Sequence, residues 1–389
     1  MATDIDDRFE DIDWDSERSA PRVGWRTGAT VAVLLGVVAV LFADQHGLGP
    51  TDQLNWTVTR IDWLFSLSLA LFVVHVVVPL ARDRERALGY WQQLREDSLA
   101  SAAAAYISVF FLLGLVGPLV LGTPVIGKKV AFQPPVLFSI DARVPYECVG
   151  PVVASRCVGT MAHPLGTTFE GKDVLLMVVM AMRITLQVGL ISATIIVPVA
   201  TVVGTVAGYV GGWVDDVLMY YVDVQQAIPA FLVYIVAIFL FGRSLFLIVL
   251  VFGLFSWGGV ARLVRSEVLQ RREELYARAA RTAGASHLQV VRRHVLPNVS
   301  GTVITATTLQ IPAIVLAEAA LAYLRLSRST LPSFGDIIAG GTIGAVLRWT
   351  DFVQAWWIAT IPAVFLALTV LSFGVLGDAL RDVLDPRQG

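Results

Sequence analysis

Residues 122–129, GTPVIGKK, have the glycine and lysine spacing of a phosphate-binding loop. In such a loop backbone amides hold the phosphates, and a serine or threonine after the lysine holds magnesium. Here Lys129 occupies the position of that hydroxyl, and VAFQPP follows where a helix should begin. We therefore interpret the stretch as a short polar loop that follows an apolar segment, and not as a nucleotide-binding site. If the protein uses ATP, another chain must bind it.

Three ionisable residues, His75, Asp223 and Glu318, lie in largely apolar runs. A charged side chain in a membrane is costly unless it faces a cavity or a partner. Glu318 could line a substrate path, carry protons or make a polar contact between helices. Asp223 could bring polarity to that path or lie near a helix end, and Pro229 permits a kink in the same helix. His75 has no visible ionisable partner, so we expect a hydrogen bond between helices.

The two cysteines, Cys148 and Cys157, lie close together in ECVGPVVASRC. In an oxidising compartment they could form a disulfide, or they could remain unpaired thiols, because two cysteines give little pattern to judge. Only His163 lies near them, so no metal site is expected. The apolar runs hold no cluster of His, Asp, Glu or Ser at one depth, and we expect no enzymatic activity.

The composition is that of an integral membrane protein. Of 389 residues, 56% are hydrophobic and 15% charged, and the mean hydropathy is +0.70, outside the usual range of a globular domain. A membrane span needs about 20 mostly apolar residues. We predict an all-α polytopic membrane protein with about eight spans, near 27–43, 61–80, 104–121, 186–208, 217–241, 245–261, 301–324 and 355–377.

The first 26 residues hold eight acidic residues and four arginines, unlike the basic start of a secretory signal peptide. We therefore expect an acidic cytosolic tail and a first span that stays in the membrane. The formal net charge of −2 gives no indication of nucleic-acid binding.

Basic residues accumulate in cytoplasmic loops, and they indicate the topology here. Four arginines lie in 81–103 and eight in 262–293, but one in 44–60. Eight spans with the N-terminus inside place both arginine-rich segments and the C-terminus in the cytosol. The predicted parts are the acidic tail 1–26, an N-terminal membrane region 27–121 with three spans, an extracellular segment 122–185 and a five-span core 186–389 with a cytosolic loop 266–298.

Charged residues in that loop follow a helical repeat. They recur at spacings of four and three: Glu267, Arg271, Glu274, Arg278 and Arg281. Such spacing places them on one face of an amphipathic helix over 267–283, with i,i+4 pairs between Glu267 and Arg271 and between Glu274 and Arg278.

A turn and a second, short helix are predicted to follow. Gly284 can adopt a left-handed conformation and end the first helix, while Ser286 and Gln289 fit the capping box that begins another. Pro297 is expected to stop the second helix. Its apolar side is formed by Leu288, Val291 and Val295. The pattern fits a rigid plug for a groove in a partner, and equally a helix on the lipid surface.

The segment ARAARTAGASHLQVVRRHVLPN, residues 277–298, resembles the coupling loop of permease subunits of binding-protein-dependent ABC importers. The family pattern is Glu-Ala-Ala, three residues, Gly, nine residues and Ile-x-Leu-Pro. Arg278 stands where the family has glutamate, and His294 where it has isoleucine. The positions that match in register are Ala279, Ala280, Gly284, Leu296 and Pro297.

The resemblance extends over residues 162–387, nearly 60% of the chain. It indicates the dipeptide, oligopeptide and nickel branch, which has a glutamate matching Glu318; this implies a packing or gate role there rather than proton transfer. Spans 27–43 and 61–80 are extra to that branch. The further matching motifs are HPLGTTFEGKDVL (163–175), AGYVGGWVDDVLMYYVDVQQAIPAFL (207–232), LAEAALAYL (316–324), PSFGDIIAGG (332–341) and LGDALRDVLDP (376–386).

The resemblance implies a multi-pass subunit of the cell membrane that forms half of a translocation pathway, most readily for peptides. A homologous second permease would complete the pathway, and an extracellular solute-binding protein would deliver the solute. Two cytosolic ATPase subunits would bind ATP and Mg and grip the coupling loop, so this chain needs no cofactor. The residues expected to couple are Ala279, Ala280, Gly284, Ala285, Leu288, Val291, His294, Leu296 and Pro297.

The main alternative is a stand-alone secondary transporter driven by ions. In that case Glu318 and Asp223 would carry protons across the membrane, and transport would persist without any ATPase.

Overall fold

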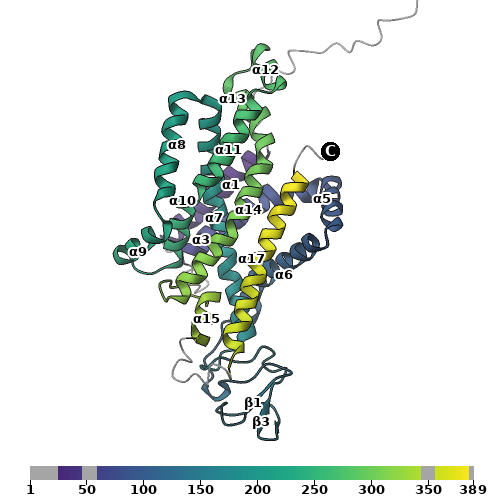
Figure 1. Cartoon of the computed structure of the whole chain (residues 1–389), viewed down its shortest axis with the longest axis vertical. Helices are drawn as coiled ribbons and strands as arrows, with labels where there is room; N and C mark the ends of the chain where they lie inside the picture. Colours follow the sequence, from purple (N-terminus) through teal and green to yellow (C-terminus); the bar gives the residue numbers. More distant parts are fainter. Residues whose placement is uncertain (1–24, 46–58, 343–354, 385–389) are drawn as a thin grey trace, which may run out of the picture.

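The computed structural model describes residues 25–45, 59–342 and 355–384. Long helices run along the molecule, with a small sheet at one end and two short helices, α12 (Leu275–Thr282) and α13 (His287–Val290), at the other (Figure 1). Of the predicted acidic tail, only the last two positions fall within the described residues.

Among the described residues, six helical stretches are long and apolar enough to cross a membrane, or seven if a bent pair is one span. The bent pair is α8 (Gly212–Ala227) and α9 (Ala230–Phe241), which meet at 72°. The six are Arg60–Arg82, Ser98–Leu121, Val174–Val210, Leu245–Arg272, His287–Tyr323 and Trp357–Val383. The predicted all-α polytopic class is confirmed.

Seven of the eight predicted spans correspond to these stretches when the bent pair is counted as one span. The first predicted span falls in α1 (Trp25–Gln45). α1 has 21 residues, most of them apolar, which is about the length that a membrane span needs.

His75 makes the interhelical hydrogen bond expected of it. Its Nε2 lies 3.3 Å from Thr30 Oγ1 of α1, and its Nδ1 lies 3.0 Å from the Leu71 carbonyl oxygen. The helices of this N-terminal region after α1 are α3 (Arg60–Phe72), the π-helical turn η3 (Val73–Val77), α4 (Val78–Arg82), α5 (Arg84–Glu96) and α6 (Ser98–Leu121).

The segment between α6 and the core carries a small three-stranded antiparallel sheet in the order β1-β3-β2. Ala154 and Ser155 have positive φ and turn the chain between β2 and β3, as a tight hairpin requires. The structure joins Cys148 and Cys157 in a disulfide, with Cα atoms 5.8 Å apart. The elements are the 3₁₀ turn η4 (Lys128–Val130), β1 (Ser139–Asp141), β2 (Val152–Val153) and β3 (Arg156–Val158).

The core is built around α7 (Val174–Val210), in which 78% of the apolar stretch is buried inside the protein. α7 begins at Val174, well before the start predicted near 186, because the Asp173 carboxylate caps it by accepting from the Leu176 amide at 3.2 Å. The other core elements are α10 (Leu245–Phe255), α11 (Trp257–Arg272), the π-helical turn η5 (Val291–Val295), α14 (Leu296–Tyr323), α15 (Phe334–Thr342) and α17 (Trp357–Leu384).

Two glycines of α7 permit α11 to approach closely. A Cβ atom added at Gly204 would lie 2.5 Å from the Ala261 carbonyl oxygen, and one at Gly208 would lie 2.8 Å from the Arg265 carbonyl oxygen. Small residues let helix backbones come together in a membrane, where packing rather than hydrophobicity drives association. The backbone of α11 thus lies directly against α7.

Gly204→Ala is therefore expected to lower the melting temperature of the protein in mild detergent, because the new methyl group meets backbone that can move only by separating the helices. The expected loss is about 1–3 kcal/mol in unfolding free energy. Gly374→Ala is the matched control, since nothing lies within 4 Å of a Cβ added there; helix propensity then favours alanine by about 0.5–1 kcal/mol. Equal melting temperatures for the two variants would contradict the close approach.

Candidate functional site

The coupling segment, residues 266–298, contains the end of α11 together with α12, α13 and η5. The continuous helix predicted over 267–283 is wrong, because α11 ends at Arg272 and α12 begins at Leu275. Glu274 is the N-cap of α12 and has an extended backbone. Its carbonyl accepts from the Ala277 amide at 3.1 Å and starts the new helix. An acidic residue at this end also complements the helix dipole.

The break rearranges the predicted ion pairs. Arg271 binds Glu267 at 2.8 Å, as predicted, but it also binds Glu274 at 3.1 Å. Arg278 instead pairs with Glu273 at 2.7 Å, so the predicted pair between Glu274 and Arg278 is wrong. The Arg278 guanidinium holds the pKa of the Glu273 carboxyl below its usual range.

Gly284 ends α12 in the conformation that the sequence predicted. Its φ is +88°. Its amide donates to the Arg281 carbonyl and the Ala285 amide to the Ala280 carbonyl, both at 3.0 Å. These two bonds define a Schellman motif, which a residue with a side chain rarely forms. The capping box predicted for Ser286 and Gln289 is present at the start of α13.

Pro297 does not stop the second helix. α13, η5 and α14 continue from His287 to Tyr323, and Pro297 lies in the first turn of α14. A proline within a helix removes a hydrogen bond and crowds the carbonyl four residues earlier. The preceding turn is π-helical, with the Leu296 amide bonded to the Val291 carbonyl, and this wider turn accommodates the ring.

Exposure divides the predicted coupling residues into two groups. Leu288 is 69% exposed, and Leu275, which was not among the predicted coupling residues, is 84% exposed. Val290 and Val295 are fully buried and anchor α13 and η5 to the core. Of the predicted residues, Ala279, Gly284, Leu288 and Pro297 are exposed, whereas Ala280, Ala285, Val291, His294 and Leu296 are partly buried. The exposed apolar surface of α12 and α13 is therefore formed by Leu275, Ala279 and Leu288.

The coupling segment is hydrogen-bonded to the C-terminal end of α7 by contacts that the sequence did not predict. The Tyr209 hydroxyl lies 3.2 Å from His287 Nδ1, and Arg272 donates to the Gly208 carbonyl at 2.8 Å. The motif AGYVGG at the end of α7, which contains Gly208 and Tyr209, is the sequence feature that marks the place of these contacts. Both α13 and the end of α11 are therefore hydrogen-bonded to the last turn of α7.

The intramembrane residues do not form one site. Asp223 on α8 is exposed and forms an ion pair with Arg262 of α11. Glu318 on α14 is 2% exposed and lies beside Ser333 and Asp336, at the turn into α15. Pro229 lies at the 72° bend between α8 and α9, as the predicted kink requires. Asp223 and Glu318 therefore lie at two separate helix contacts, between α8 and α11 and between α14 and α15.

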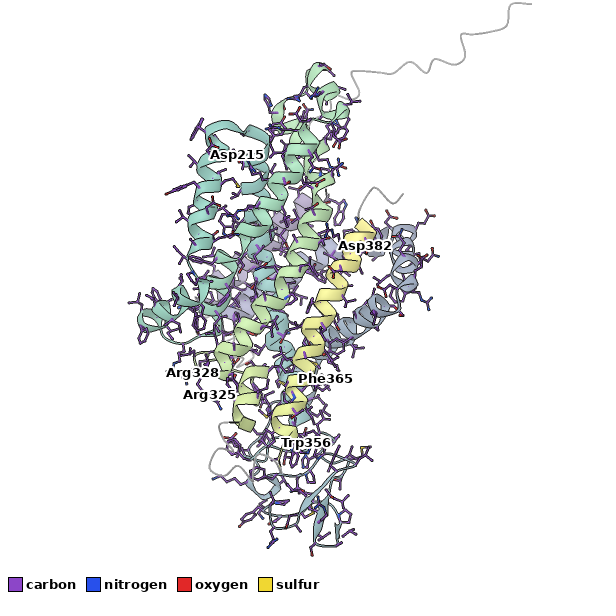
Figure 2. The ribbon with its side chains drawn as sticks, in the orientation of Figure 1. Asp215, Arg325, Arg328, Trp356, Phe365 and Asp382 are labelled. Atoms are coloured by element: carbon purple, nitrogen blue, oxygen red, sulfur yellow. A yellow bond between two sulfur atoms is a disulfide. The ribbon has the colours of Figure 1, made fainter. Side chains whose placement is uncertain are left out.

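A second ion pair, absent from the sequence prediction, joins α8 to α11. Arg265 donates two hydrogen bonds to the Asp215 carboxylate. The Asp215 side chain is 11% exposed, and its place beside the turn after α7 is seen in Figure 2. Bidentate pairs of this kind fix geometry as well as charge.

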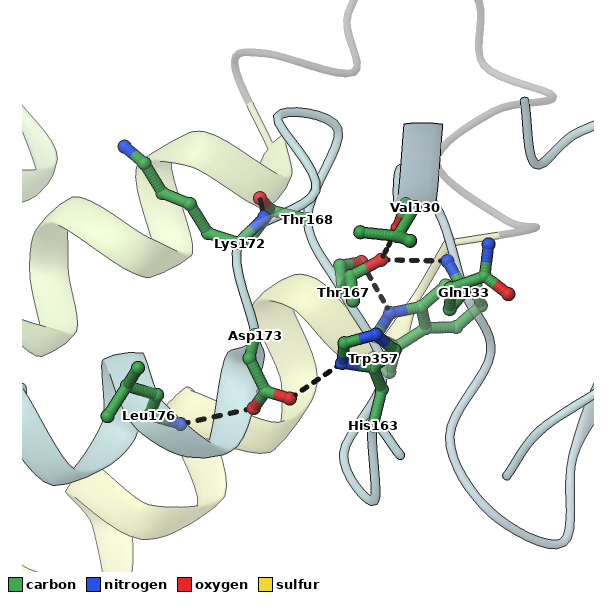
Figure 3. Close-up of polar contacts among 9 residues, drawn as sticks. All are labelled: Val130, Gln133, His163, Thr167, Thr168, Lys172, Asp173, Leu176 and Trp357. Carbon is green, nitrogen blue, oxygen red and sulfur yellow. Dashed lines mark hydrogen bonds and ion pairs between the residues drawn. The ribbon is translucent and has the colours of Figure 1, made fainter. Parts of the chain in front are cut away.

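Residues 122–173 carry the small sheet and are called the outer segment below. The motif HPLGTTFEGKDVL joins this segment to the core through polar contacts (Figure 3). His163 Nδ1 lies 2.8 Å from the Asp173 carboxylate that caps α7. The Thr167 hydroxyl donates to the Val130 carbonyl at 2.6 Å and accepts from the Gln133 amide at 2.8 Å. Trp357 of α17 donates to the Thr167 carbonyl at 3.1 Å. The outer segment is thus fixed to α7 and α17.

No group of three His, Cys, Asp or Glu side chains within residues 25–45, 59–342 and 355–384 could hold a metal ion.

Residues 200–389 match the family described as the binding-protein-dependent transport system inner membrane component. The chain is 32% identical to the dipeptide transport system permease protein DppC of Bacillus subtilis, over 76% of this chain and 84% of the relative. It is 32% identical to the oligopeptide transport system permease protein OppC of Salmonella typhimurium, over 76% of this chain and 91% of the relative. It is 34% identical to the oligopeptide transport system permease protein OppC of Escherichia coli, over 58% of this chain and 72% of the relative.

Because some residues of the coupling segment are exposed and others are buried, two small substitutions are expected to differ in their effect on stability. Val295→Ala is expected to lower the unfolding free energy by about 1–3 kcal/mol, because it leaves a cavity in packed surroundings. Leu288→Ala should change it by less than about 0.5 kcal/mol, because the side chain is exposed. Denaturation of both variants in detergent measures the difference. A Leu288→Ala variant as unstable as Val295→Ala would show that Leu288 is part of the core.

Proposed function

Because the chain belongs to the family of binding-protein-dependent transport system inner membrane components, we propose that it is the membrane-spanning subunit of an ATP-driven peptide importer. The observation that carries this function is the coupling segment: two short helices held at a fixed angle by Gly284, with Leu275 and Leu288 exposed. An exposed apolar pair on a rigid support fits a groove in a partner protein.

The coupling segment would bind one of two cytosolic ATPase subunits, which hold ATP and Mg. Leu275, Ala279 and Leu288 would form the apolar contact, and Gly284 would set the angle between the helices. A homologous second permease would enclose the pathway with this chain, since one such bundle leaves the path open on one side. An extracellular binding protein would deliver the peptide.

Coupling follows from the continuity of the helix that begins in this segment. α13, η5 and α14 form one helical stretch from His287 to Tyr323, so movement of α13 by a closing ATPase passes to α14 without an intervening loop. Tyr209 and Arg272 transmit the same movement to α7. ATP binding would shift both permeases from the inward-open to the outward-open state, and hydrolysis would return them to the inward-open state.

The proposed orientation places the coupling segment and both termini in the cytosol. α12 and α13 lie at the end of the molecule opposite the sheet (Figure 1). The eight arginines of 262–293 lie in and next to these two helices in the sequence. The disulfide belongs to the opposite end, where an oxidising compartment would keep it.

No observation favours the stand-alone ion-driven transporter. Asp223 is already paired with Arg262, and Glu318 is enclosed beside α15.

The first test is purification of the tagged chain from its native membrane in mild detergent, with mass spectrometry of the proteins recovered in stoichiometric amounts. We expect a second permease and a cytosolic ATPase. Leu288→Asp should remove the ATPase, because a charge replaces the apolar contact. Leu137→Asp, at a leucine of the outer segment that is 91% exposed, should keep it. A chain that purifies alone and still transports after reconstitution would contradict the proposal.

Gly284 provides a second test. Gly284→Val should abolish ATP-driven peptide uptake while membrane insertion is kept, because a β-branched residue at φ +88° cannot keep the angle between α12 and α13. Gly284→Asn should retain most of the uptake, since asparagine tolerates the left-handed region. No atom lies within 4 Å of a Cβ added at this position, so steric bulk alone predicts no loss. Normal uptake by Gly284→Val would overturn the coupling mechanism.

A further inference from the structure

A polar cavity of about 450 Å³ opens at the end of the molecule that carries the sheet. It lies between the loop 325–332 after α14, the start of α15 and the motif residues 168–172. A second cavity of about 370 Å³ adjoins it and shares Arg325, Ser327, Arg328 and Asp336. Figure 2 shows Arg325 and Arg328 close together below the end of α14.

Where the two cavities meet, positive charge is in excess. Arg243, Arg325 and Arg328 line the second cavity together with one carboxylate, Asp336. Asp336 is engaged by Arg325 at 3.7 Å and by the Ser333 amide at 3.2 Å. Two of the three guanidinium charges therefore have no carboxylate to balance them.

Arg328 in particular is available to a ligand. Within the part of the chain that the structure describes, its guanidinium has no ion pair or hydrogen bond, and the residue is exposed. The Ser327 hydroxyl next to it is buried and has no hydrogen-bond partner. A buried hydroxyl is normally satisfied, so a donor and a cation without partners line one cavity.

The backbone that presents these groups is held rigidly. Arg243 donates to the Arg325 carbonyl at 2.9 Å, the Tyr234 hydroxyl to the Leu326 carbonyl at 2.8 Å, and the Leu245 amide to the Arg328 carbonyl at 3.1 Å. Three carbonyls of one loop are thereby tied to α9, α10 and the turn between them. A pre-organised loop loses little freedom when it binds.

The chemistry of the cavity selects a carboxylate next to an apolar group. A guanidinium and a carboxylate match as a planar bidentate pair. The rest of the wall includes the apolar side chains Met177, Leu331 and Ile337. A short peptide in neutral water presents such a pair, because its C-terminal carboxylate is ionised and lies beside the last side chain. The volume is within the range of small-molecule sites.

We infer that this cavity, which Ser327 and Arg328 line, receives the C-terminal carboxylate of the peptide on the outer side of the permease. The inference rests on the proposed function and adds a residue by which the permease itself recognises the substrate.

The test uses the complete importer in proteoliposomes with saturating binding protein, and compares the uptake of alanyl-phenylalanine with that of its C-terminal amide. Arg328→Gln should lower uptake of the free acid about tenfold, as expected for loss of a charge-assisted hydrogen bond, and leave uptake of the amide unchanged. Arg328→Lys should give an intermediate uptake of the free acid, because lysine keeps the positive charge but lacks the two parallel N–H donors of the guanidinium. Arg143→Gln, in the outer segment with a side chain 90% exposed, is the matched control and should behave as the unmodified chain.

Each contrary result has a distinct meaning. An equal loss for acid and amide in Arg328→Gln would overturn the inference and indicate that Arg328 receives an acidic side chain of the binding protein. Unchanged uptake of both would overturn it as well, while the importer function would stand. If the unmodified importer takes up neither peptide, the proposed function fails and this inference fails with it. Recovery of the complex with its ATPases verifies folding of each variant.

Discussion

The close approach of α7 and α11 is the constraint on which the rest of the structure depends. At Gly204 and Gly208 the carbonyl oxygens of Ala261 and Arg265 occupy the space where side chains would be. Because α7 is the most buried of the spanning helices, every other core element is positioned against it directly or through α11. The ion pairs from Asp215 to Arg265 and from Asp223 to Arg262 then fix α8 against the exposed side of α11.

This central position makes α7 the connection between the two ends of the molecule. Its first turn is capped by Asp173, which also binds His163 of the outer segment. Its last turn receives Arg272 at the Gly208 carbonyl and His287 at Tyr209. A helix with fixed contacts at both ends cannot tilt at one end alone. In the proposed mechanism, α7 would therefore link movement of the coupling segment to rearrangement of the outer segment.

Local signals in the sequence were sufficient for the spanning helices, the turn at Gly284 and the capping box at Ser286, because each depends on a few adjacent residues. They were insufficient for the break at Glu274, where ion pairs of Arg271 and Arg278 to neighbouring carboxylates compete with the regular helical spacing. The π-helical turn before Pro297 and the burial of Val290 and Val295 also depend on packing against the core. Apolar periodicity identifies a helix face, but only the tertiary fold decides whether that face meets the core or a partner. The cavity at Arg328 assembles segments more than 100 residues apart, which no local pattern reveals.

The departure of Arg278 from the family glutamate has a structural explanation in the same break. A basic residue at this position would reverse the charge of the coupling surface if it stood alone. Glu273, freed from the helix by the turn before Leu275, pairs with it instead. Both side chains are more than half exposed, so water screens the pair and it contributes little to stability. Its effect is on the surface: the charge is balanced locally, and Leu275 and Leu288 remain the dominant outward features. In the proposed contact, the ATPase would therefore bind the apolar side chains, and the glutamate-to-arginine change would need no compensating change in the ATPase.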